Sequence, residues 1–112
     1  MTTTTTVAER YVAAVNDADE AALMGLFAHD AVLRHPIGTY EGRDAIAGFY
    51  RDVVFAGKAH TDITRLVGGP GVEIAQIEAT SPLGEPGNRA HAVDVFTLGL
   101  EGLIQTLEIY YR

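Results

Sequence analysis

The sequence contains no cysteine. This absence excludes a disulfide framework, thiolate zinc sites and cysteine nucleophiles. Basic residues are also few, with 8 Lys and Arg against 15 Asp and Glu, so the formal net charge is −7. An acidic surface repels phosphate backbones and anionic lipids, and we therefore expect neither nucleic acid nor a membrane as a partner.

Long apolar runs are missing as well. No stretch approaches the roughly 20 residues that a membrane-spanning helix needs. The segment from Met1 to Thr6 has neither the basic region nor the apolar region of a secretory signal. We expect residues 1–5 to form a disordered polar tail, and the protein to be cytoplasmic.

Apolar residues are plentiful, since hydrophobic types make up 47% of the 112 residues. A chain of this length buries about two-thirds of its unfolded surface and can form a core without covalent staples. The sequence therefore predicts one domain, residues 1–112.

The first half has helical periodicity. Residues 7–15 carry apolar side chains at helical spacing, and Thr6 with Glu9 has the pattern of a capping box. Asp19 can cap a second short helix. That helix is expected to carry Ala22, Leu23, Leu26 and Phe27.

A short extended segment and a third helix are predicted next. Residues 31–35 precede Pro36, which keeps His35 out of the helical region. Residues 38–42 read as a turn region, and residues 43–56 as the third helix. Its expected apolar face consists of Ile46, Phe49, Tyr50 and Val53.

The second half has the pattern of strands. The expected strands are residues 59–67, 72–80, 89–98 and 103–111, with connections at 68–71, 82–88 and 99–102. Helices followed by a strand meander predict an α+β fold, in which helices pack on one face of a mostly antiparallel sheet.

Asp94 is the most informative polar residue of these strands. By alternation, it shares a face with four apolar residues, Ala90, Ala92, Phe96 and Leu98. An ionised carboxylate on such a face must be paired, or its pKa must rise until it stays neutral. The alternative is that Val93 and Val95 face the core. We favour the first interpretation because the second face also carries Arg89, His91 and Thr97.

Three further residues could do chemistry, and each also has a structural interpretation. Tyr11 and Tyr50 lie on apolar helix faces, where a core tyrosine usually gives its hydroxyl a backbone partner. His35 shares a strand face with Ala31 and Leu33, which is typical of a structural histidine. An ordinary imidazole pKa of about 6.5 nevertheless suits a general base.

Other chemistries find no support. His29, His60 and His91 lack paired spacing and are predicted to lie on the surface, which gives no metal signature. Ser81 precedes Pro82 in a predicted loop, so it reads as a turn residue and not as a nucleophile. No glycine-rich phosphate loop follows a strand.

Four segments together resemble the ketosteroid isomerases, which share a fold with nuclear transport factor 2 and the SnoaL-like polyketide cyclases. The segments are residues 10–16, 31–38, 45–50 and 92–96. The resemblance spans nearly the whole chain, and the joint presence of Tyr11 and Asp94 is its most specific part. It implies a cone-shaped NTF2-like fold, with three N-terminal helices packed on a curved, mostly antiparallel sheet.

The resemblance also implies roles for residues. Tyr11 and a neutral Asp94 would form an oxyanion hole, as in the isomerases, which keep a carboxylic acid protonated so that it donates a hydrogen bond. His35 stands where the isomerases carry an aspartate base, and Tyr50 would support Tyr11. The implied pocket wall consists of Leu33, Phe49, Ala92 and Phe96.

The implied reaction moves the double bond of a β,γ-unsaturated ketone into conjugation. It needs no metal and no organic cofactor, and its ligand is a small apolar ketone or a steroid-like molecule. The resemblance further implies a homodimer formed through the outer sheet face, near Val93 and Val95.

Three alternatives remain open. A SnoaL-like cyclase would use the same acid and base for an aldol closure. Epoxide hydrolysis on this fold needs an Asp-Arg-Asp arrangement around a water, which Arg34 does not support because it faces away from His35. A non-catalytic module would bind an apolar ligand or a protein, although such a module gains nothing from a buried carboxyl group at Asp94.

Overall fold

The structure is a computed structural model, and it describes residues 6–83, 87–99 and 101–111. The predicted tail at 1–5, part of the predicted loop 82–88 and residue 100 of the predicted connection 99–102 lie outside the described residues.

Local signals place the first two helices where the sequence predicts them. α1 (Val7–Asn16) begins at a complete capping box formed by Thr6 and Glu9. α2 (Glu20–Met24) begins at Asp19, whose side chain accepts a hydrogen bond from the Ala22 N–H. Both caps confirm the predicted starts.

α2 ends earlier in the sequence than predicted. Leu26 and Phe27 were expected on this helix, but the helix ends at Met24, and Phe27 begins β1 (Phe27–His35). The reason is tertiary, because the backbone of Phe27 pairs with Ile104 of the last strand. The same pairing makes β1 longer than the predicted segment 31–35 and places His29 in a strand.

The turn predicted at residues 38–42 is mostly strand. β2 (Gly38–Glu41) pairs antiparallel with β1, so the turn consists only of Pro36 and Ile37. This hairpin precedes α3 (Arg43–Phe49), whose Arg43 guanidinium donates two hydrogen bonds to the carbonyl of Phe27, at 2.6 and 3.0 Å. These bonds fix the start of α3 against β1.

α3 continues as a π-helical segment, η1 (Tyr50–Phe55). A π-turn holds more residues than an α-turn and therefore moves the buried stripe along the sequence. Ile46, Phe49 and Tyr50 are buried as predicted, whereas Val53 is 44% exposed. The expected burial of Val53 was wrong, and the half-buried Val54 takes its place.

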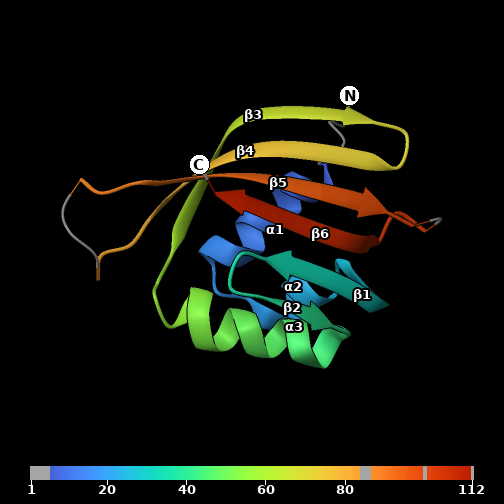
Figure 1. Ribbon diagram of the computed structural model, residues 1–112, viewed down its shortest axis with the longest axis horizontal. Helices are drawn as coiled ribbons and strands as arrows, with labels where there is room; N and C mark the ends of the chain where they lie inside the picture. The colour runs from blue at the N-terminus through green and yellow to red at the C-terminus, as the bar shows by residue number, and fades with distance from the viewer. Residues whose placement is uncertain (1–5, 84–86, 100, 112) are drawn as a thin grey trace.

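The second half forms four strands close to their predicted bounds. They are β3 (His60–Gly69), β4 (Val72–Thr80), β5 (Ala90–Leu98) and β6 (Ile104–Tyr111). With β1 and β2 they build a curved six-stranded sheet in the order β2-β1-β6-β5-β4-β3 (Figure 1). The β1–β6 pair is parallel and the other pairs are antiparallel, so the sheet is mixed.

The expected order of helices before strands needs a correction. β1 and β2 lie between α2 and α3, so the helices do not all precede the sheet. α1 lies behind β5 and β6, and α3 lies along the β2 side (Figure 1). The core fills the space between these helices and the inner sheet face. No described helix has the length and apolar character needed to cross a membrane.

Candidate active site

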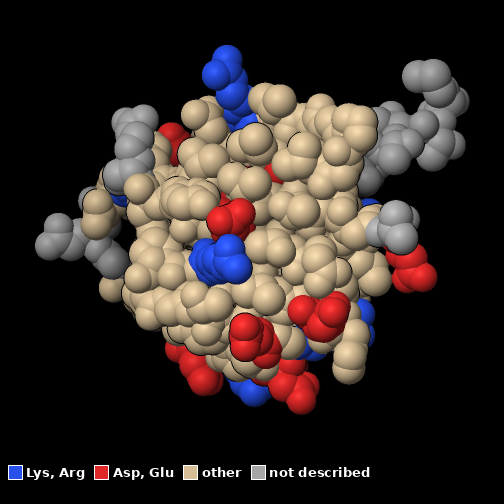
Figure 2. Space-filling view, turned by 45° about the vertical axis from the view of Figure 1, so that its right-hand side comes forward, with Lys and Arg blue, Asp and Glu red and all other residues tan. Residues whose placement is uncertain are grey.

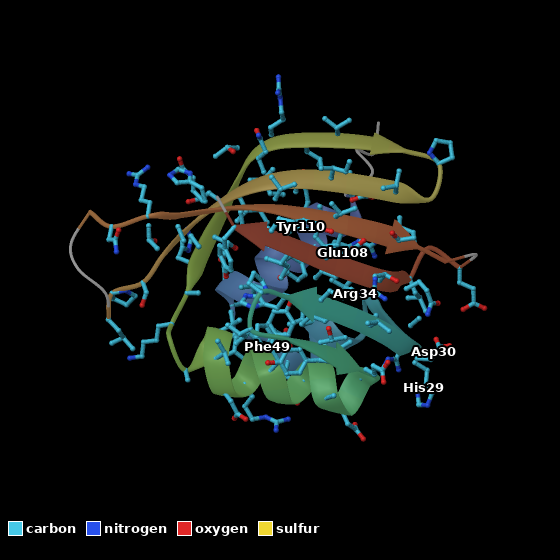
Figure 3. The ribbon with its side chains drawn as sticks, in the orientation of Figure 1. His29, Asp30, Arg34, Phe49, Glu108 and Tyr110 are labelled. Carbon is cyan, nitrogen blue, oxygen red and sulfur yellow. The ribbon has the colours of Figure 1, made fainter. Side chains whose placement is uncertain are left out.

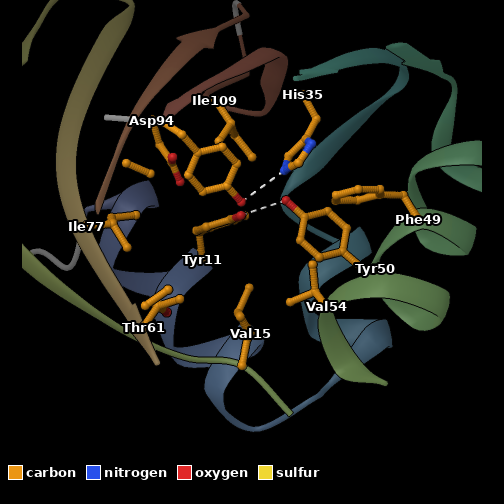
Figure 4. A pocket seen from close by; sticks show the side chains of 14 residues that line it. Tyr11, Val15, His35, Phe49, Tyr50, Val54, Thr61, Ile77, Asp94 and Ile109 are labelled. Carbon is orange, nitrogen blue, oxygen red and sulfur yellow. Dashed lines mark hydrogen bonds between the residues drawn. The ribbon is translucent and has the colours of Figure 1, made fainter. Parts of the chain in front are cut away.

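A small apolar cavity opens between the inner sheet face and the helices. Its volume is about 90 Å³. Most of its wall is aliphatic or aromatic, and Phe49 and Ala92 belong to it as predicted. The groups in the wall that can form directed hydrogen bonds or titrate include Tyr11, His35, Tyr50, Asp94 and Tyr111. Figure 4 shows the labelled members of this group converging on one space.

Asp94 lies at the buried, inner end of the cavity. It lies on β5 between Ala75 of β4 and Ile109 of β6, and it is 3% exposed. Its inward orientation confirms the prediction from strand alternation. Among the described residues its carboxyl group has no hydrogen-bond partner, and burial raises its pKa to about 7. The carboxyl group is therefore about half protonated at neutral pH.

Tyr11 and Tyr50 form a hydroxyl pair beside Asp94. The two oxygens are 2.6 Å apart, and both residues are buried (Figure 4). Burial raises the pKa of both phenols, and the charge of an ionised Asp94 raises them further. Both tyrosines therefore stay protonated and can donate. α1 is held in place by Glu73 of β4, which accepts a hydrogen bond from the Ala8 N–H at 2.8 Å.

His35 lies at the end of β1, on the opposite side of the cavity from Asp94 (Figure 4). The imidazole is half-buried, and this burial lowers its pKa. Nε2 lies 3.0 Å from the hydroxyl of Tyr111, and Nδ1 accepts the Ile37 N–H at 3.2 Å. The ring centroid of Phe49 is 4.9 Å away.

Tyr111 was missed in the sequence analysis. It lies on β6 opposite Ala92 and is 53% exposed, yet its ring lines the cavity. Alternation gives a signal that could have found it, because Leu107, Ile109 and Tyr111 share one strand face. Its contact with His35 depends on the parallel β1–β6 pairing, which no local pattern reveals.

Two predicted wall residues do not line the cavity. Leu33 and Phe96 are fully buried in the core, and neither contributes to the wall. On one face of a strand, residues i and i+2 are about 6–7 Å apart. Ala92 therefore lies on the cavity side of Asp94, whereas Phe96 lies on the far side, packed edge-on against Tyr11 at 5.2 Å.

The other histidines lie outside the site. His29 and His60 are exposed as predicted, whereas His91 is half-buried, 3.9 Å from Glu78. In the described part of the chain no three His, Asp or Glu side chains gather as metal ligands would. Arg34 is exposed and lies on the outer face, away from His35, as predicted (Figure 3).

Comparison with known proteins identifies a relative in sequence and solved structures of similar fold. A steroid Δ-isomerase of Nocardioides simplex is 29% identical over 104 residues, which cover 91% of this chain and 84% of the relative. The crystal structure of a candidate polyketide cyclase from Sinorhizobium meliloti has a TM-score of 0.82 at 22% identity, with 93% of each chain covered.

A candidate ketosteroid isomerase from Kribbella flavida has a TM-score of 0.81 at 18% identity, with 95% of this chain and 75% of the other covered. At these identities the two solved structures show the fold alone. The model of the SnoaL-like domain family matches residues 8–106, which is most of the chain. The protein therefore belongs to the SnoaL-like domain family, whose fold is NTF2-like.

Proposed function

We propose that this protein is a ketosteroid isomerase-like enzyme, which moves the double bond of a β,γ-unsaturated ketone into conjugation by intramolecular proton transfer. One observation carries the proposal. The buried carboxyl group of Asp94, which has no hydrogen-bond partner among the described residues, faces a cavity together with the Tyr11–Tyr50 hydroxyl pair, and His35 lies on the other side. The similarity to a steroid Δ-isomerase supports it.

The reaction starts at the ketone oxygen. It accepts hydrogen bonds from the Tyr11 hydroxyl and from protonated Asp94. His35 removes a proton from the α-carbon, and the electron pair of the broken C–H bond moves into a dienolate. The same proton then passes from His35 to the γ-carbon, which leaves the conjugated ketone and a neutral imidazole.

The oxyanion is stabilised because its donors are already in place. Fixed donors in a site without water commonly provide the largest single contribution to such catalysis. Tyr50 holds the Tyr11 hydroxyl through the 2.6 Å contact and therefore acts as a supporting residue. No step needs a metal or an organic cofactor.

The size of the cavity limits how the ligand enters. A volume of about 90 Å³ is well below the roughly 300–1,000 Å³ of pockets that enclose a drug-sized ligand. The ring that carries the ketone and the double bond occupies the cavity, and the remainder of a steroid-like substrate lies outside it.

The reaction can be followed by absorbance. The purified protein is mixed with a β,γ-unsaturated 3-ketosteroid, and formation of the conjugated enone is recorded. We expect turnover, and we expect His35→Ala to lower kcat by about 10²-fold or more, as for loss of a general base. His60→Ala is the matched control, because His60 is an exposed histidine near Asp62. A rate no higher than that of buffer, or full activity of His35→Ala, would contradict the proposal.

Two other outcomes would favour one of the alternative functions over the isomerase. Tight binding of a planar phenol without turnover would favour a binding module. Ring closure of a poly-β-ketone without enone formation would favour a polyketide cyclase. We consider this alternative because the fold is similar to that of the S. meliloti structure.

We also propose a homodimer formed through the outer sheet face. Ile74 is 39% exposed there, and Val93 and Val95 are half-buried. Uncharged residues cover most of the face in view, and acidic side chains gather toward its lower edge (Figure 2). Light scattering at increasing concentration is expected to give twice the monomer mass, and a constant monomer mass would contradict the dimer.

A further inference from the structure

We propose that Tyr111 is a positioning residue for His35, because its hydroxyl holds the imidazole over the cavity while the ring proton changes place. The effect on catalysis rests on the proposed function. The contact itself does not, since it is a property of the free protein that can be measured without any substrate.

Tyr111 reaches His35 through the register of the sheet. β1 and β6 run parallel, with Leu33 opposite Leu107 and Arg34 opposite Glu108. Tyr111 follows four residues after Leu107 on the same face, at the end of its strand. Its ring meets the imidazole edge-on at 5.2 Å, and its hydroxyl lies 3.0 Å from Nε2.

The other ring nitrogen selects the resting tautomer. Nδ1 accepts the N–H of Ile37 at 3.2 Å, so in the neutral ring the proton lies on Nε2 and is donated to the Tyr111 oxygen. A base that takes a proton on Nε2 needs the opposite tautomer, with the ring proton on Nδ1. The Ile37 N–H cannot serve that tautomer.

A hydroxyl group can serve both tautomers. The Tyr111 oxygen accepts from a protonated Nε2, and its O–H donates to an unprotonated Nε2. The change of tautomer therefore costs the long, exposed Ile37 hydrogen bond but keeps the Tyr111 contact. Phe49, whose ring centroid is 4.9 Å away, packs against the imidazole as well. Nε2 has one lone pair, so the Tyr111 O–H must turn away from it as Nε2 takes the substrate proton, and the Tyr111 oxygen then accepts from the N–H that forms. The Tyr111 contact thus holds the ring before and after the proton transfer.

On the cavity side, His35 forms its hydrogen bond with Tyr111. The other titratable groups around the cavity are Asp94 of β5, Tyr11 of α1 and Tyr50 of η1. On the opposite face of the sheet lie Arg34 and Glu108 (Figure 3). Phe49 of α3 and Gly38 of β2, the residue paired with His35, carry no charge.

Tyr111→Phe tests the inference because it removes only the hydroxyl. An imidazolium is a stronger donor than a neutral ring, so the Tyr111 oxygen stabilises the charged form more. We therefore expect Tyr111→Phe to lower the pKa of His35 below its wild-type value. Nitrogen-15 NMR of the histidine rings measures this pKa and the tautomer, and the loss of one set of signals in His35→Gln assigns them.

Tyr110→Phe is the matched control. Tyr110 is the neighbouring residue, it is similarly exposed, and its hydroxyl donates to Glu108 at 2.9 Å on the outer face (Figure 3). We expect this variant to leave the pKa of His35 unchanged. In the wild type we expect the Nε2–H tautomer.

The result that overturns the inference is an unchanged His35 pKa in Tyr111→Phe, or an Nδ1–H tautomer in the free wild type. If the enzyme isomerises ketones, Tyr111→Phe should also lower kcat about tenfold with little change in KM. A lowered pKa in an enzyme without isomerase activity would support the contact and reject the proposed reaction, so the two failures can be told apart.

Discussion

The two ends of the cavity contain opposite kinds of titratable group in different environments. At the inner end, Asp94 is 3% exposed and burial raises its pKa to about 7. At the outer end, His35 is half-buried and burial lowers its pKa. Desolvation disfavours whichever form is charged, so it moves an acid and a base in opposite directions.

One apolar cavity can therefore prepare both partners of a proton transfer. The carboxyl group becomes available as a neutral donor, and the imidazole stays neutral and able to accept a proton. The depth of each group sets how far its pKa moves. The inner group should therefore show the larger effects when it is changed.

The largest expected effect is the pH dependence of folding caused by Asp94. Between about pH 4 and pH 7 the folded protein keeps a proton that the unfolded chain has released, so the free energy of unfolding falls as pH rises through this range. A shift from 3.8 to about 7 corresponds to roughly 4 kcal/mol. Asp94→Asn should remove this slope in urea unfolding, whereas Asp62→Asn, at an exposed position, should keep it. The same slope in wild type and Asp94→Asn would show that Asp94 titrates normally.

Next in size is the loss of the buried donor for catalysis. Asp94→Leu should lower kcat by about 10²–10³-fold, as for removal of an oxyanion-hole donor, and Asp94→Asn should lower it less because an amide still donates. Steady-state kinetics of both variants on the unsaturated ketone measure the difference. Equal losses would argue against a donor role for Asp94.

A smaller effect is expected at the neighbouring phenol. Tyr11→Phe removes a donor but leaves the Tyr50 hydroxyl close by, so we expect a loss of about tenfold in kcat, or about 1.4 kcal/mol. Tyr40→Phe, at a half-buried tyrosine that packs on Phe49, provides the control. Unchanged kcat in Tyr11→Phe would remove Tyr11 from the oxyanion hole.

The smallest effect should come from the outer end. Since the pKa of His35 is lowered on folding, stability is lost as pH falls below about 6.5, where the unfolded chain takes up the proton first. The imidazole is only half-buried, so solvent screens its charge and the loss should stay below about 1 kcal/mol. Urea unfolding of His35→Gln between pH 5 and 7 should lack this acid-side loss. If His35 changed the free energy of unfolding with pH more than Asp94 does, the inner end would not have the larger effect, contrary to the expectation.

Much of the inner end could be predicted from sequence because it depends on local patterns. Alternation along β5 places Asp94 inside, and helical spacing places Tyr11 and Tyr50 on buried faces. The cap at Thr6 sets the start of α1, the helix that carries Tyr11.

The outer end depends on pairings that local patterns do not contain. Tyr111 meets His35 because β1 and β6 are parallel neighbours, and Phe27 leaves the helical pattern for the same pairing. The exposure of Val53 follows from a π-turn whose position has no signal in the apolar spacing. Alternation also does not separate the cavity wall from the core. For this reason Leu33 and Phe96, which belong to the core, were predicted to line the cavity.

Side-chain NMR titration of Asp94 and His35 in one sample tests the central claim most directly. Carbon-13 shifts of the carboxyl group and nitrogen-15 shifts of the imidazole report both protonation states without a substrate. The account predicts an Asp94 pKa near 7 and a His35 pKa lowered below its ordinary value of 6.5, so that just below neutral pH the neutral form of each group predominates. An Asp94 carboxyl group that titrates near 4 would contradict it, because the cavity would then hold a carboxylate in place of a neutral carboxyl donor.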